Sequence, residues 1–411
     1  MIYLDAAATT PARREVLEAM WPLLTGGFGN PSSHHSAGEA AARALESARA
    51  AAASVLGCRP AEIIFTSGGT EADNLAVKGL ALAGLDRLSR RAGNGTGGLS
   101  ADSGLPGRPA NGQAPHLVST AVEHPAVLES LEYLQRRHGF AVTLLPVDAA
   151  GRVDPAEAAA ALTPATVLCS VMYANNEVGT VQPVREIAAH CRAAGVPFHT
   201  DAVQAGGWLD LDVTGLGVDA LSLSGHKLGA PKGTGLLYLR GAEVLEPLLH
   251  GGGQERGRRS GTENVAGAVG MATALVLAAA ERDGSARRAA ALRNRLIDAV
   301  LAGVPGARLT GDRSARLPGH ASFCFPGTSG EAVLLELERA GVLCSSGSAC
   351  AAGSDEPSAV LTAMGLDRET AQTAVRFTFT AALGESDIDQ AAEAVIGAVA
   401  AVGRLGGTHA G

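Results

Sequence analysis

The sequence predicts an α/β protein with a large domain, built on a mainly parallel seven-stranded sheet, and a smaller α+β domain. Apolar runs alternate with helical patterns from about residue 15 to residue 260, as in a parallel sheet covered by helices. After Gly261 the sequence changes to long Ala/Leu/Arg-rich helices and two alternating segments at residues 321–325 and 375–379. We therefore assign residues 17–262 to the large domain, and residues 1–16 and 263–411 to the small domain.

Seven short apolar segments are the predicted strands of the large sheet, because each has strand length and is bounded by turn or helix-start residues. They are residues 63–66, 116–120, 143–146, 167–172, 196–199, 220–223 and 235–239. Residues 86–115 interrupt this pattern with glycines and almost no apolar side chains. Such a composition predicts a flexible surface insertion.

Composition excludes several classes of protein. A net charge of −8 and a pI near 5.8 argue against general affinity for nucleic acid. We find no long uncharged apolar stretch that a membrane span would need. The first residues lack a charged-then-apolar leader, so we expect a cytoplasmic protein. The six cysteines form no CxxC pair and are too few for a disulfide scaffold of this length.

Polar residues follow two of the predicted strands, and in open α/β sheets the carboxyl ends of strands bind ligands. Asp201 follows the segment 196–199, with Gln204 three residues later, and Lys227 follows the segment 220–223 in a Gly/Pro-rich turn. A lysine against an apolar wall is easier to deprotonate, as a covalent amine requires. An aspartate nearby can pair with a pyridinium nitrogen. The pair therefore suggests pyridoxal 5′-phosphate.

A third element supplies a phosphate site. Residues 62–75 read as a strand, a Ser-Gly-Gly-Thr turn that contains Gly69 and Thr70, and a helix. Such a turn presents backbone N–H groups and the positive end of a helix dipole. The segment lacks the residues of a P-loop or of a dinucleotide fingerprint. A surface lysine or a helix-capping aspartate would explain Lys227 or Asp201 alone, but the three elements together fit a phosphorylated cofactor.

Two further segments could serve the same site. His124 precedes Pro125 at the start of a predicted helix, where the dipole lowers the pKa of the imidazole and favours the neutral form that transfers protons near pH 7. A role as a helix-start residue alone is the alternative. Asn175 and Asn176 follow the segment 167–172; their amides could bind a cofactor oxygen, although turn chemistry explains them equally well.

One cysteine is a candidate nucleophile. Cys350 lies in a run of small residues at 345–357, where no aliphatic bulk buries the thiol, so we expect an exposed and reactive cysteine. Cys344 follows an apolar pair and is expected to pack inside.

With these residues assembled, the chain closely resembles the cysteine desulfurases of the NifS/IscS type, the class V branch of the fold-type I pyridoxal-phosphate enzymes. The resemblance covers nearly the whole length and is carried by five motifs. They are Tyr-Leu-Asp-Ala-Ala-Ala-Thr-Thr at 3–10, Gly-Asn-Pro-Ser-Ser at 29–33 with His35, Gly-Gly-Gly-Gln-Glu-Arg at 251–256, Arg-Ser-Gly-Thr at 259–262, and the Cys350 loop. The long loop resembles the group whose mobile cysteine delivers sulfur to several acceptors.

The resemblance implies roles for particular residues. Lys227 would bind the cofactor covalently and move the substrate Cα proton, His124 would stack on the ring and transfer protons, and Cys350 would accept sulfur. Asn30 and Arg376 would bind the substrate carboxylate. The implied cofactor site consists of Gly69, Thr70, His124, Asn176, Asp201, Gln204, Ser224, His226, Lys227 and, from the second subunit of a homodimer, Thr262.

The implied reaction converts L-cysteine to L-alanine and leaves a persulfide on Cys350. An acceptor protein would then take the sulfur, either an iron–sulfur scaffold or a tRNA-thiolating enzyme. The resemblance implies no resident metal, although Cys350 is a candidate transient ligand of an iron–sulfur cluster. The alternatives are a selenocysteine lyase, a sulfur donor for DNA phosphorothioation, another class V enzyme such as an aminotransferase, and a catalytically inactive scaffold. The presence of Lys227 and Cys350 argues against the last.

Overall fold

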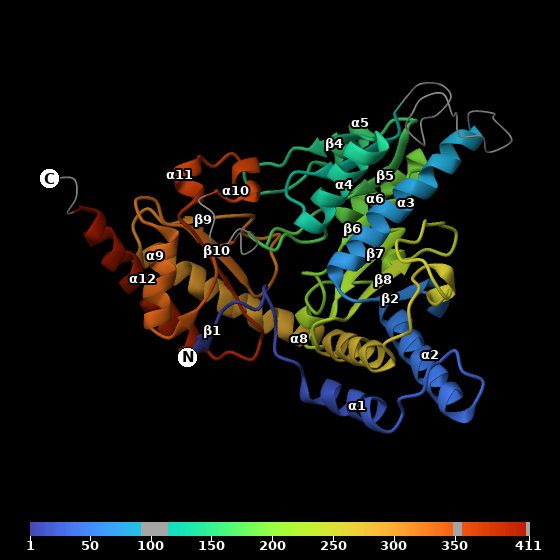
Figure 1. Ribbon diagram of the computed structural model, residues 1–411. Coiled ribbons are helices and arrows are strands. Elements are labelled where there is room, and N and C mark those ends of the chain that lie inside the picture. Colours follow the sequence, from blue (N-terminus) through green and yellow to red (C-terminus); the bar gives the residue numbers. More distant parts are fainter. Residues whose placement is uncertain (92–113, 348–355, 408–411) are drawn as a thin grey trace.

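The computed structural model describes residues 1–91, 114–347 and 356–407 of the chain. Two bodies lie side by side, with the long helix α8 (Val265–Gly303) running between them (Figure 1). The larger body contains a seven-stranded sheet in the order β2-β8-β7-β6-β5-β3-β4. β8 is antiparallel to both of its neighbours, and the five strands from β7 to β4 are parallel to one another. The predicted fold class, with a mainly parallel seven-stranded sheet, is therefore confirmed.

All seven predicted strands are present, and three have the predicted bounds. The strands are β2 (Ile63–Thr66), β3 (His116–Thr120), β4 (Ala141–Leu145), β5 (Thr166–Ser170), β6 (Phe198–Asp201), β7 (Ala220–Ser224) and β8 (Gly235–Leu239). β6 begins two residues later than predicted. Pro197 precedes it, and proline has no N–H to donate to a sheet ladder. The shift makes Asp201 the last residue of β6 rather than part of the following turn.

Helices cover both faces of this sheet. They are α1 (Arg14–Thr25), α2 (Ser36–Leu56), α3 (Gly69–Arg91), α4 (Pro125–His138), α5 (Pro155–Ala161), α6 (Val184–Ala194), α7 (Val213–Leu216) and three short 3₁₀ turns, η1 (Pro60–Glu62), η3 (Gly225–Lys227) and η4 (Glu255–Gly257). Successive strand residues point to opposite faces. Ile63 packs into the core with α2 and α8, whereas Ile64 packs into the core with α3 and α4.

The predicted insertion begins later than the sequence indicated. α3 continues to Arg91, so residues 86–91 are helical rather than part of a loop, because the apolar face of α3 reaches as far as Leu85 and Leu88 at the edge of its core. The rest of the insertion, at 92–113, lies outside the described residues.

The small domain is a mixed α+β unit. β12 (Ala374–Thr378), β10 (His320–Cys324) and β9 (Arg308–Leu309) form an antiparallel sheet, and β1 (Ile2–Tyr3) pairs with β11 (Val342–Leu343). Its helices are α9 (Gly330–Arg339), α10 (Ala359–Ala363), α11 (Arg368–Ala371) and α12 (Glu385–Gly407). Phe323 contacts Phe325 and Phe377 in its core, at centroid distances of 5.9 and 6.1 Å.

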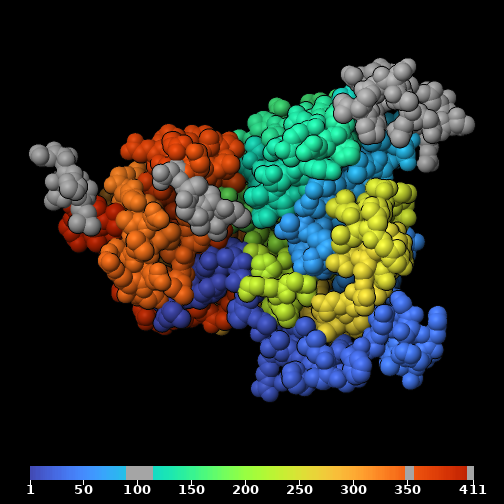
Figure 2. All heavy atoms as spheres, in the orientation of Figure 1, coloured from blue at the N-terminus to red at the C-terminus, as the bar shows by residue number. Residues whose placement is uncertain are grey.

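Two segments connect the domains. The first half of α8, including Met271 and Leu275, packs into the large core, and its second half, including Leu296 and Val300, packs into the small core. The N-terminal residues start in the small domain and then cross to the large one, between the orange-to-red and the green-to-yellow bodies in Figure 2.

α8 corrects one expectation from composition. By length and composition alone this helix could cross a membrane, but 56% of its apolar 18-residue stretch is buried inside the protein. Because this part of the helix contributes residues to the large core, packing within the protein explains its apolar character.

Two leucines of α9 give a matched test of the small core. Leu337 is fully buried and Leu335 is 56% exposed. We expect Leu337→Ala to lower the free energy of unfolding of the small domain by about 2–5 kcal/mol, because the truncation leaves a cavity. Leu335→Ala should change it by no more than about 0.5 kcal/mol. Native-state hydrogen exchange of the β10 amides measures both, and equal effects would contradict the packing described.

Candidate active site

Asp201 and Lys227 lie at the same edge of the large sheet. Asp201 ends β6, and Lys227 ends the 3₁₀ turn that follows β7, the parallel neighbour of β6. The Asp201 side chain is buried, and one carboxylate oxygen accepts the Val203 N–H at 2.8 Å. The Lys227 ammonium donates to the Ala8 carbonyl oxygen at 2.7 Å and to that of Ala7.

His124 completes an electrostatic group with these two residues. Burial raises the pKa of Asp201, while His124 and Lys227 act to lower it. The pKa of His124 is lowered, as predicted, but burial is the largest cause rather than the helix dipole. His124 is the N-cap of α4, and its Nδ1 accepts the Ala126 N–H at 3.1 Å. The proton of the neutral ring therefore resides on Nε2.

The glycine turn forms a cradle against the ends of the two strands. α3 begins at Gly69, where the first N–H groups of a helix have no partner within the helix. A Cβ atom on Gly69 would lie 2.7 Å from Cγ2 of Val203 and 3.3 Å from Cβ of Ser224. Only glycine lets the helix start approach Ser224, the last residue of β7, so closely.

The N-terminal segment crosses the same site. His226 Nδ1 lies 3.2 Å from Oγ1 of Thr9, and Gln204 Nε2 donates to the Ala7 carbonyl oxygen at 3.1 Å. Burial lowers the pKa of His226 to about 4, assisted by Lys227. The imidazole is therefore neutral at pH 7 and can only hydrogen-bond an anion.

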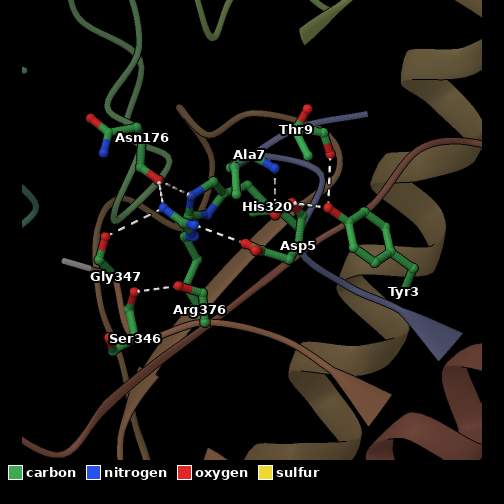
Figure 3. A network of polar contacts seen from close by, with 12 residues as sticks. Tyr3, Asp5, Ala7, Thr9, Asn176, His320, Ser346, Gly347 and Arg376 are labelled. Atoms are coloured by element: carbon green, nitrogen blue, oxygen red, sulfur yellow. Dashed lines mark hydrogen bonds and ion pairs between the residues drawn. The ribbon is translucent and has the colours of Figure 1, made fainter. Parts of the chain in front are cut away.

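Arg376 lies at the domain boundary, on β12 (Figure 3). Its guanidinium forms an ion pair with Asp5 at 2.9 Å and donates to the carbonyl oxygens of Asn176 at 2.9 Å and Gly347 at 3.3 Å. The side chain is 3% exposed, and its buried Nε has no partner among the residues that the structure describes. A buried donor without an acceptor favours an anionic ligand at this position.

The structure does not bring every predicted residue together. Asn30 lies in the exposed connection between α1 and α2, and its side-chain oxygen accepts the Ser32 N–H. Thr262 is exposed. Asn176 reaches Arg376 through its backbone oxygen, whereas its side chain points away from the guanidinium (Figure 3). Cys350 lies outside the described residues, so its predicted place in the site stays a prediction.

Three buried polar residues beside Asp201 were missed from the sequence. Glu123 Oε1 accepts from Thr120 Oγ1 and from the Met172 N–H, both at 2.8 Å. In the part of the chain that the structure describes, its Oε2 has no partner. Burial raises the pKa of Glu123 to about 8 and raises that of Asp73, while it lowers the pKa of His199 to about 3. His199 could have been found, because it precedes Asp201 by two residues and shares its face of β6.

A cavity of about 460 Å³ opens beside Lys227, between the domains. Gln204, Trp208, His320 and Thr378 also line it, but Asp201 and His124 do not. It therefore adjoins the group of Asp201, Lys227 and His124 rather than enclosing it. Within residues 1–91, 114–347 and 356–407, no group of three or more His, Cys, Asp or Glu side chains is arranged to hold a metal ion.

Comparisons with known proteins identify the family of the chain. The family model described as Aminotransferase class-V matches residues 2–88 and 107–391. An IscS-like cysteine desulfurase of Mycobacterium tuberculosis is 44% identical over 414 residues, which cover 100% of this chain and 99% of that protein. The chain belongs to the class-V aminotransferase family and, within it, to the cysteine desulfurases.

Solved structures give the same result. A NifS-like protein is 34% identical, with a TM-score of 0.84 over 96% of this chain and 98% of that one. A structure titled "SspA in complex with cysteine" is also 34% identical, with a TM-score of 0.76 over 92% of this chain and 99% of the other.

Glu123 gives the site a pH-dependent stability. Because its pKa is raised from 4.5 to about 8, the folded protein keeps a proton that the unfolded chain releases. This stabilisation is complete below pH 4.5 and is lost as the pH rises through 8. Relative to Glu123→Gln, the wild type should lose on the order of 1 kcal/mol per pH unit between about pH 5 and 8.

Urea midpoints of the cofactor-free proteins at several pH values test this expectation. Glu129→Gln is the control, because Glu129 is exposed on α4, the helix that follows Glu123. A difference between wild type and Glu123→Gln that does not vary with pH would show that Glu123 ionises normally in the folded protein.

Proposed function

We propose that this chain, as a member of the cysteine desulfurases, releases L-alanine from L-cysteine and passes the sulfur to an acceptor protein. The observation that carries the proposal is the burial of Asp201 beside Lys227, at the ends of neighbouring strands and next to the Gly69 cradle. A phosphorylated pyridine aldehyde requires a carboxylate for its ring nitrogen, an amine for its aldehyde and an anion site for its phosphate.

Pyridoxal 5′-phosphate fits these residues. Thr70, Ser224 and His226 would hold its phosphate, and Gly69 leaves room for it. Asp201 would hold the proton on the pyridine nitrogen, since His124 and Lys227 both favour its anionic form. When bound, the cofactor supplies an electron sink for the carbanion at the substrate Cα. Lys227 would remove the Cα proton, and its contacts with the Ala7 and Ala8 carbonyl oxygens hold the amine in the site.

Arg376 would bind the substrate carboxylate. Its Nε, which has no partner within residues 1–91, 114–347 and 356–407, supplies the donor, and a guanidinium matches a carboxylate in shape and charge. Asp5, the Asn176 oxygen and the Gly347 oxygen fix its orientation. His124, with its ring neutral and its proton on Nε2, would transfer a proton during the reaction.

Cys350 would accept the sulfur. The bond between Cβ and sulfur of the substrate breaks, a bond forms between that sulfur and Cys350 Sγ, and the products are L-alanine and a persulfide. The acceptor thiol then takes the outer sulfur and regenerates Cys350. Iron–sulfur assembly and tRNA thiolation are the proposed destinations.

A homodimer is proposed on two grounds. α1 presents an exposed apolar stripe of Leu17, Trp21 and Leu24, at 48%, 67% and 59% exposure, and these positions share one helix face. Thr262 is exposed, and its proposed role in the phosphate site of a neighbouring subunit requires a second copy.

The proposed compartment is the cytoplasm. The cysteines within the described residues are all free thiols, as expected in a reducing environment. They are Cys58, Cys169, Cys191, Cys324 and Cys344.

The role of Cys350 is tested with a matched cysteine. Cys350→Ala should keep the visible absorption of the bound cofactor and lose release of alanine and sulfide from L-cysteine. Cys344→Ala should keep activity within about threefold, because Cys344 packs against the small core and burial raises the pKa of its thiol to about 12, which makes it a poor nucleophile.

Both variants are assayed with excess reductant. Full turnover of L-cysteine by Cys350→Ala would overturn the persulfide step. A wild type that turns over L-selenocysteine but not L-cysteine would assign the lyase alternative instead.

Arg376→Lys tests the carboxylate site. The variant loses a charge-assisted hydrogen bond of about 1.5–3 kcal/mol, so the KM for L-cysteine should rise about 10–100-fold with a smaller change in kcat. Binding of cysteamine, which lacks the carboxylate, should not change. Arg339→Lys is the control, because Arg339 is 76% exposed on α9. An equal loss for cysteamine would assign Arg376 a structural role.

A further inference from the structure

The loop between β8 and α8 contacts the phosphate cradle through one ion pair. Arg259 Nε and Nη2 donate to the two carboxylate oxygens of Glu71 at 2.8 and 3.2 Å. Glu71 stands in the first turn of α3, next to Thr70, and its Oε2 also accepts the Ser67 N–H at 2.8 Å. The carboxylate therefore connects the glycine turn on one side to an arginine of a distant loop on the other.

This loop is held in a strained conformation. Glu255 and Arg256 have φ angles of 48° and 61°, which non-glycine residues adopt only when their surroundings impose them. Glu255 forms a buried two-bond ion pair with Arg49 at 2.7 and 3.0 Å, with both side chains at most 3% exposed. Arg49 and Arg256 both donate to the Ile63 carbonyl oxygen on β2. These contacts hold the backbone of the loop in place and so restrict the position of Arg259.

The charge of Glu71 poses a problem for an anion site. Burial would raise its pKa, but hydrogen bonds from Arg259 and Ser67 outweigh burial and lower it, so the carboxylate is ionised at pH 7. A carboxylate in the first turn of a helix competes with a phosphate for the same dipole and repels it. His226 is neutral at this pH and does not compensate the charge.

We propose that Arg259 is a positioning residue that neutralises Glu71, so that the helix start can accept the cofactor's phosphate dianion. Glu71 orders the turn by accepting the Ser67 N–H, and Arg259 removes the electrostatic penalty of that arrangement. The two side chains are 18% and 23% exposed, and such partial burial leaves the pair less screened by salt than a fully exposed one. The inference rests on the proposed function, because it takes the Gly69 cradle as the phosphate site.

A double-mutant cycle tests the proposal. Dissociation constants of pyridoxal 5′-phosphate and of inorganic phosphate are measured on cofactor-free Arg259→Ala, Glu71→Gln and the double variant. Arg259→Ala leaves Glu71 uncompensated and should weaken both ligands about 10–100-fold. Glu71→Gln should stay within about threefold of wild type, and the double variant should recover most of the loss. The defect of Arg259→Ala should shrink at high salt.

Two further variants separate charge from structure. Arg258→Ala is the loop control, because Arg258 donates to the Ala61 carbonyl oxygen at 3.1 Å and hydrogen-bonds no carboxylate of the described residues. This variant should bind both ligands normally. Arg259→Lys keeps the charge and should stay within about fivefold of wild type, and it serves as the test should Arg259→Ala not fold.

Three outcomes would overturn the inference. They are unchanged affinity in Arg259→Ala, a double variant as weak as Arg259→Ala, and an Arg259→Lys as weak as Arg259→Ala. Failure of the proposed function would look different, because the wild type itself would then not bind pyridoxal 5′-phosphate.

Discussion

The burial of Asp201 beside Lys227 is the constraint on which the rest of the site depends. Ionised groups are costly to bury alone, so the two residues and His124 must lie together. The parallel order of β6 and β7 meets this requirement, because it brings the carboxyl ends of neighbouring strands to one edge. Gly69 then allows α3 to start against the same edge, which adds the helix start that we propose as the phosphate site.

The N-terminal segment extends this arrangement to the domain boundary. The carbonyl oxygens of Ala7 and Ala8 accept from Lys227, and the Asp5 carboxylate pairs with Arg376. A single stretch of backbone thus fixes the amine on the large domain and the guanidinium on the small one. The relative position of the domains and the geometry of the site are consequently set by the same contacts.

Much of this was predictable from the sequence because it depends on local patterns. Strand ends followed by Asp201 and Lys227, and the glycine turn at Gly69, are visible in short windows. The pairing of Asp5 with Arg376 was not predicted, because 371 residues separate them and no local pattern encodes their contact. The contact of Arg376 with the Gly347 oxygen likewise has no local pattern. The burial of His124 depends on how distant segments pack around it, so the sequence indicated the helix dipole and not burial as the cause of its lowered pKa.

The charges around the site occur in compensated sets. Asp201 is balanced by Lys227, and Glu71 is balanced by Arg259. Glu123 and His199 are neutral because burial shifts their pKa values toward the uncharged forms. Asp73 lies 3.7 Å from His199, and burial raises the pKa of its carboxyl group as well. An arriving phosphate or carboxylate therefore meets oriented N–H groups in a nearly neutral surrounding rather than an excess of positive charge. Affinity in such a site depends on geometry, which explains why so many of its contacts are made by backbone atoms and by residues whose only role is to hold another residue in place.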